Sequence, residues 1–123
     1  MAKQGSDATR EAVALAYSQT DAAPRVVAKG VDLIALRIRD VAKEHKVPVL
    51  QSPMLARALY AHAEIDDQIP AALYTAVAQV LAYVYQLKAA MAGRGAMPGD
   101  LPTPEVPPEL DPHWKKPVAE ATP

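Results

Sequence analysis

Cysteine is absent from the 123 residues of this sequence. Its absence excludes disulfides, thiolate nucleophiles and the zinc sites that use sulfur ligands, and it suits a reducing compartment. An excess of basic charge is also missing, because 13 lysines and arginines are matched by 14 acidic residues. With no basic block to neutralise a run of phosphates, nucleic-acid binding driven by charge is excluded.

Long apolar runs are missing as well. The first ten residues, MAKQGSDATR, contain no apolar core of a signal peptide. No other run approaches the ~20 apolar residues that a membrane-spanning helix requires. We therefore expect one small cytoplasmic protein that does not insert into a membrane by itself.

Proline divides the chain, since eight of the 12 prolines lie in residues 93–123. This stretch has few large apolar side chains and cannot offset the entropy of ordering itself. We expect residues 1–10 to be a disordered arm, residues 11–90 to be the folded domain and residues 91–123 to be a disordered proline-rich tail. The tail is either a solvated end without a role or a docking segment centred on Trp114, because tryptophan is a frequent interface anchor.

The domain alternates strand patterns with helical patterns. Apolar alternation in residues 12–17, 25–29 and 47–51 predicts strands. Apolar residues at helical spacing predict helices over residues 31–45, 54–63 and 69–90. The inward faces expected for the first and last helices are Ile34, Ile38, Val41 and His45, and Leu73, Val77, Val80, Val84 and Leu87. The predicted fold is α/β (α+β-like), a central sheet of about three strands flanked by three helices in the order β-β-α-β-α-α.

Chemistry-bearing residues are sparse. His62, Glu64, Asp66 and Asp67 lie close in sequence and have the side chains of a metal or acid/base site. The stronger interpretation is a loop between two helices, in which acidic residues complement the dipole of the following helix. No glycine-rich phosphate loop and no nucleophile arrangement accompany them. We expect no metal, no cofactor and no enzyme.

Four stretches carry a resemblance to a known family: VVAKG, LIALRIR, LARALY and VLAYVYQLK. Together with the intervening residues from about 12 to 88, they resemble the cytoplasmic domain of the FlhB/YscU family, the export-switch proteins of flagellar and type III secretion systems. The resemblance is greatest to the flagellar branch. It implies a small α/β domain with a central sheet flanked by helices.

The resemblance also implies a difference at the site where members of this family cleave themselves. They do so after the asparagine of an Asn-Pro-Thr-His tetrapeptide, and this position falls here on Asp7, Ala8, Thr9 and Arg10. Asp7 lacks the amide nitrogen that attacks the backbone carbonyl, and Arg10 stays protonated where histidine titrates. The four residues are therefore interpreted as a vestigial cleavage loop, and we expect no self-cleavage.

Family members carry a membrane half and one further strand ahead of the tetrapeptide. Neither precedes it in this sequence, so the strand from Ala12 to Tyr17 is expected to have a free edge, which is a template for pairing. A strand donated by a partner or by a second copy is favoured over the N-terminal arm, because MAKQGSD has no β-branched or aromatic residue.

The leading functional hypothesis is a non-enzymatic export-switch-like module that binds export-apparatus components or export substrates. It would be cytoplasmic, recruited to the apparatus at the inner membrane, and able to substitute for the downstream fragment of a full-length relative. Its expected partner-binding residues are Arg37, Arg39, Lys43, Asp66, Asp67 and Trp114. The alternative is an adaptor or chaperone-like regulator outside secretion that reuses the fold. A small hydrolase using His62 and Glu64 is the third hypothesis.

Overall fold

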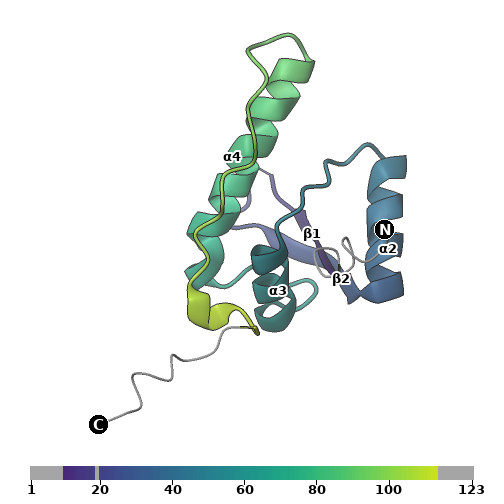
Figure 1. Ribbon diagram of the computed structural model, residues 1–123, viewed down its shortest axis with the longest axis vertical. Helices are drawn as coiled ribbons and strands as arrows, with labels where there is room; N and C mark the ends of the chain where they lie inside the picture. The colour runs from purple at the N-terminus through teal and green to yellow at the C-terminus, as the bar shows by residue number, and fades with distance from the viewer. Residues whose placement is uncertain (1–9, 19, 114–123) are drawn as a thin grey trace.

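The computed structural model describes residues 10–18 and 20–113 (Figure 1). In this part of the chain two strands and three α-helices follow one another, with two short 3-10 turns, η1 and η2. Their bounds are β1 Glu11–Ala16, β2 Arg25–Val31, α2 Asp32–Glu44, α3 Pro53–His62, η1 Ala71–Leu73, α4 Tyr74–Met91 and η2 Pro108–Leu110. The predicted mixture of a small sheet and three helices is confirmed. None of the helices in the described residues has the length and apolarity needed to cross a membrane.

The sheet is an antiparallel hairpin of β1 and β2. Its register pairs Glu11 with Val31 and Ala14 with Ala28, and then shifts so that Leu15 pairs with Val26. The extra residue, Val27, sits in a bulge and is exposed. Val26 is fully buried, so β2 supplies the centre of the hairpin's contact with the helices.

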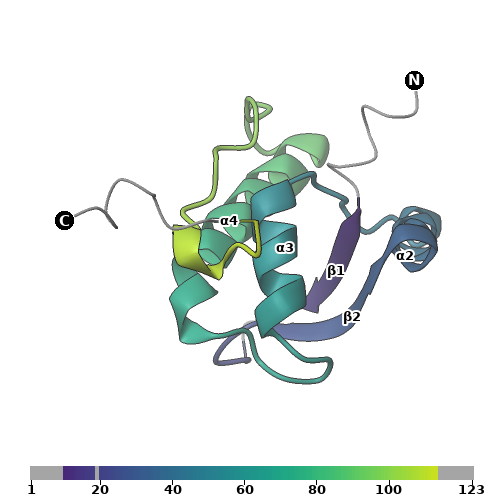
Figure 2. The same cartoon turned by 60° about the horizontal axis from the view of Figure 1, so that its bottom comes forward.

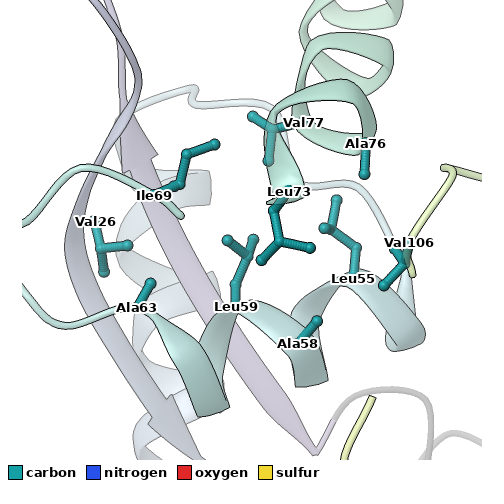
Figure 3. Packing of buried hydrophobic residues seen from close by; sticks show 10 residues of the cluster. All are labelled: Val26, Leu55, Ala58, Leu59, Ala63, Ile69, Leu73, Ala76, Val77 and Val106. Atoms are coloured by element: carbon teal, nitrogen blue, oxygen red, sulfur yellow. The ribbon is translucent and has the colours of Figure 1, made fainter. Parts of the chain in front are cut away.

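The helices lie on two sides of the hairpin, with α2 on one side and α3 and α4 on the other (Figure 2). Ten buried residues form the core between β2, α3, α4 and the C-terminal segment (Figure 3). Alanines at 58, 63 and 76 let these elements approach closely, and Leu73 and Val77 begin the stripe predicted for α4. That stripe is buried at its N-terminal end, while Val80 and Val84 are only half-buried.

The third predicted strand is wrong. Residues 47–51 form no strand, and Val47 and Val49 are exposed. A strand needs a neighbour with which to exchange backbone hydrogen bonds, and the described residues provide none for this segment. The sheet of the described chain therefore has two strands rather than three.

The predicted inward face of α2 is also displaced. Ile34 is 60% exposed, whereas Ala35 is fully buried. A two-stranded hairpin offers a narrow surface, and a small side chain lets the helix lie close to it. Gly30 allows this approach, because a Cβ at Gly30 would collide with Cγ2 of Ile34.

The C-terminal segment corrects the predicted domain boundary at residue 90. After α4 the chain turns back, runs along that helix and reaches α3 through η2 (Figure 1). Val106 belongs to the core with only 8% of its surface exposed, and Leu110 packs against the core. A high proline content favours disorder, but prolines also reduce the entropy that a segment loses on docking. The folded unit thus extends to at least residue 111, and residues 114–123 lie outside the described residues.

Candidate protein-binding site

An open apolar pocket lies where the β1–β2 connection meets the first turns of α4. Its volume is about 320 Å³. The connection contributes one wall and α4 the other, and the lining residues are Tyr17, Ala22, Ala23, Pro24, Tyr74, Val77, Ala78 and Leu81. Buried Val77 and Ala23 close the pocket, while Tyr17 and Tyr74 stand at its rim, 51% and 44% exposed.

Local hydrogen bonds hold the wall formed by the connection. The Ser18 amide donates to Oδ2 of Asp21 over 2.9 Å, and the Asp21 amide donates back to the Ser18 carbonyl over 3.0 Å. The Ile69 amide donates to the Pro24 carbonyl over 3.0 Å, which ties the connection to the segment before α4. These bonds hold the connection in place beside the segment that leads into α4.

The residues that line the pocket favour the binding of a protein partner. Its lining contains alanine, valine, leucine, proline and tyrosine, and no carboxylate, imidazole or amine. Exposed aromatic rims around an apolar floor are typical of protein-binding sites, in which apolar anchors are desolvated and tyrosine supplies contact area. The arrangement can therefore accept an apolar side chain of a partner.

The predicted cationic contact residues all lie on α2. Arg37 and Lys43 are exposed, and Arg39 is half-buried and makes an interaction of its own. Their neighbours on the same helix include the exposed apolar side chains of Leu33 and Leu36. None of these residues lines the apolar pocket, and their role in partner binding stays a prediction.

The predicted acidic contact residues lie in the loop after α3. The amide of Asp66 donates to the Val26 carbonyl over 2.7 Å, and the Val26 amide donates to the Asp67 carbonyl over 3.0 Å. These backbone bonds dock the loop on β2, while both carboxylates remain exposed. Trp114, the remaining predicted contact, lies outside the described residues.

His62 and Glu64, the alternative chemical pair, have separate contacts. The Nε2 atom of His62 lies 3.0 Å from the Leu110 carbonyl oxygen, and Oε1 of Glu64 lies 3.6 Å from Nζ of Lys29. Lys29 also donates to the carbonyls of Tyr60 and Ala63 and so caps the end of α3. Within the described residues no group of three or more acidic, histidine or cysteine side chains could hold a metal ion.

Of the predicted vestigial cleavage loop, the structure describes Arg10 alone, and Asp7, Ala8 and Thr9 lie outside the described residues. The Arg10 carbonyl accepts a 2.9 Å hydrogen bond from the amide of Asp32, and its Nε lies 3.7 Å from Oδ1 of that residue. Arg10 thus ties the start of β1 to the start of α2.

Sequence reasoning missed the pocket and the anchoring of the C-terminal segment. The pocket joins residues from two parts of the chain that no local pattern connects. One signal was present, since Tyr74 falls outside the apolar stripe predicted for its helix. The pairing of Arg57 with Asp111 spans 54 residues and left no signal in the sequence.

The chain matches known proteins over most of its length. The FlhB HrpN YscU SpaS family matches residues 6–84. The flagellar biosynthetic protein FlhB of Salmonella typhimurium is 57% identical over 101 residues, which cover 79% of this chain and 26% of that protein. FlhB of Bacillus subtilis is 48% identical over 81 residues, which cover 65% of this chain and 22% of that protein.

Solved structures give the same result. The cytoplasmic domain of FlhB from Shewanella putrefaciens superposes with a TM-score of 0.80 at 46% identity, covering 87% of this chain and 84% of that domain. The PscU C-terminal domain superposes with a TM-score of 0.60 at 40% identity, covering 62% of this chain and 98% of that domain. This chain spans about a quarter of the length of the full FlhB proteins that it matches. The match with family, relatives and fold leads to one conclusion: the chain belongs to the FlhB/YscU family, the export-switch proteins of flagellar and type III secretion systems.

Proposed function

We propose that this chain is a protein-binding module of a flagellar or type III export apparatus, and that it binds apolar segments of export substrates or apparatus components in the pocket between the β1–β2 connection and α4. The observation that carries the proposal is the composition of this pocket, an open apolar site with Tyr17 and Tyr74 at its rim. Its occupant would bury an apolar side chain against Val77 and Leu81. By this activity the module would stand in for the downstream fragment of a full-length relative.

To test the proposal, the chain is immobilised and used to capture proteins from a lysate of the source bacterium. Ala78→Gln places a longer polar side chain in the pocket, and Ala61→Gln makes the same change at an exposed position of α3 outside it. We expect quantitative mass spectrometry to find export substrates or apparatus proteins enriched on the native chain and on Ala61→Gln, and reduced on Ala78→Gln. Equal capture by the two variants would exclude the pocket as the binding site.

The outer edge of β1 supports a second mode of partner binding. Within the described residues β1 pairs with β2 alone, and residues 47–51 form no strand. A strand added beside β1, from a partner or from a second copy, would satisfy its free backbone groups.

We propose further that the chain does not cleave itself. The reason is chemical, since the position of the family's reacting asparagine is held by Asp7 and that of its proline by Ala8. Intact mass spectrometry after prolonged incubation at neutral pH should show one species near 13.1 kDa. A fragment that begins at Ala8 would contradict this expectation.

A further inference from the structure

Residues 99–111, here called the strap, lie across α4 and α3. The strap contains one short 3-10 turn and is otherwise irregular. It contacts α4 through two polar groups. The hydroxyl of Tyr83 donates to the Gly99 carbonyl over 2.6 Å, and the Glu105 amide donates to Oε1 of Gln79 over 2.8 Å. Both bonds use backbone groups of the strap, so they do not depend on which side chains the strap carries at those positions.

Val106 is the apolar anchor of the strap. Its side chain enters the core beside Leu55 of α3 and Ala76 of α4 (Figure 3). Prolines at 104, 107 and 108 flank it and restrict the backbone on both sides, and the Val106 amide donates to the Pro104 carbonyl over 3.0 Å. A groove between α3 and α4 therefore receives one aliphatic side chain from a proline-rich segment.

Asp111 is the charged anchor, five residues further on. Arg57 donates to it twice, from Nε to Oδ1 over 2.8 Å and from Nη2 to Oδ2 over 2.9 Å. The two side chains are only 16% and 8% exposed. The His113 amide adds a third bond to Oδ1 over 3.0 Å. Two-point donation from arginine to a carboxylate fixes orientation as well as charge, so this anchor selects an acidic residue at one position.

The connection between α4 and the strap has few contacts. Residues 92–97 are all exposed, and a Cβ placed on Gly93 or Gly95 would meet no atom within 4 Å. The strap is thus attached to the domain as a ligand is on a tether. Backbone hydrogen bonds, an apolar anchor and a charged anchor hold it at separate points. Proline-rich peptides are recognised in this way because their extended form costs little entropy to bind.

We propose that the groove between α3 and α4 is a recognition site for proline-rich acidic segments, that the strap is its intramolecular occupant, and that a partner segment with the same chemistry displaces it. The partner segment carries an aliphatic residue between prolines and an aspartate five residues later. The site is separate from the apolar pocket and goes beyond the function proposed above. A tethered occupant acts at an effective concentration in the millimolar range. A partner therefore binds when its segment has a higher affinity for the groove than the tethered strap, or when the strap is loosened.

The test uses a fluorescein-labelled synthetic peptide, GDLPTPEVPPELDPH, which is residues 99–113 of this sequence. It is titrated by fluorescence anisotropy into the whole chain and into Asp111→Asn, in which the strap is loosened while Arg57 remains. We expect Asp111→Asn to bind the peptide at least tenfold more tightly than the native chain does. The matched control is Glu109→Gln, the same acid-to-amide change at an exposed strap residue, which should bind the peptide as the native chain does.

Two further arms identify the recognised groups. Adding Arg57→Gln to Asp111→Asn should weaken peptide binding by tenfold or more, and so should asparagine in the peptide at the position of Asp111, because a charge-assisted pair is lost. Thermal melts establish that each variant is folded. If Asp111→Asn does not fold, Val106→Ala loosens the strap at its other anchor and takes its place.

Three outcomes would overturn the proposal. The peptide could bind none of the folded loosened variants, or bind equally well with and without Arg57. In the third outcome, light scattering finds that the loosened chain is a dimer from which the peptide is excluded, and the groove then belongs to the strap of a second copy rather than to a partner.

Discussion

Lys46 and Gly93 occupy the same place at the ends of two different helices. Both have left-handed backbone, with φ of 59° and 81°. In each case the next amide donates to a carbonyl five residues back, from Val47 to the Ala42 carbonyl over 2.8 Å and from Arg94 to the Ala89 carbonyl over 2.7 Å. This hydrogen-bond pattern favours glycine, which lacks the Cβ that makes left-handed backbone costly. Only the end of α4 has the favoured residue.

Lys46→Gly should therefore stabilise the protein. We expect a gain of up to about 1 kcal/mol in the free energy of unfolding, because the left-handed conformation costs other residues about that much. Urea denaturation followed by circular dichroism measures the change. The reciprocal control is Gly93→Ala, which should lose about 1 kcal/mol. If Lys46→Gly is less stable than the native chain, the lysine side chain contributes more to the free energy of unfolding than its left-handed backbone costs.

Asp111 links stability to pH. The hydrogen bond from Arg57 lowers the pKa of Asp111 to about 2, below an ordinary value of 3.8. The same bond raises the pKa of Arg57. Because the folded state favours the ionised carboxylate, its contribution is complete above about pH 4 and is lost as the pH falls through the folded pKa.

Asp111→Asn should accordingly destabilise the protein at pH 7 by about 2 kcal/mol, the size implied by a shift of this magnitude. The difference in unfolding free energy between the native chain and the variant should become smaller as the pH falls from 4 to 2, since the native carboxylate becomes protonated there. Unfolding free energies at a series of pH values measure both effects. A difference that stays constant down to pH 2.5 would contradict the linkage.

At the scale of elements, β1 is the strand whose pairing is incomplete in the described chain. Its amides that point away from β2 should exchange with solvent quickly in dilute monomer. A peptide with the apolar alternation of a β-strand should slow their exchange and raise the thermal midpoint, because a ligand specific for the folded state stabilises it. A peptide with proline at every second position is the control, since it cannot donate to a ladder. Amides already protected without peptide, together with an unchanged midpoint, would show that the edge is not available.

The sequence predicted the elements whose signals are local. Pro53 and Pro70 marked the starts of α3 and the η1–α4 region, and the buried part of the α4 stripe was found from its spacing. The strand predicted at residues 47–51 has the right side chains, but a strand is defined by a neighbour, and no periodicity supplies one. Ile34 fits a helical face by spacing, yet the narrow hairpin contacts Ala35 instead. The candidate pocket could not be predicted, because Pro24 and Leu81 meet only in the folded chain.

At the scale of the whole molecule, the strap closes the core. Val106 belongs to the same buried cluster as Leu55, Ala58 and Ala76, and Leu110 packs against that cluster. Removal of the strap would expose this surface and would leave the Arg57 guanidinium without its carboxylate partner. Burial of one valine is worth roughly 1.5–3 kcal/mol, so the strap supplies a substantial part of the stability of a small domain.

A chain that ends at residue 98 should therefore melt at a clearly lower temperature than the native chain. A chain that ends at residue 113 keeps every contact described above and should melt with the native protein, which makes it the matched control. Limited proteolysis adds an independent measurement, because cleavage within the exposed residues 92–97 should leave the strap fragment bound, and the two pieces should elute together in size-exclusion chromatography. Adding Asp111→Asn should release that fragment, since the cut removes the tether that otherwise offsets a weak anchor. If the chain ending at residue 98 melts with the native protein, the strap does not contribute to the core, and the domain ends at α4 as the proline content of the sequence first indicated.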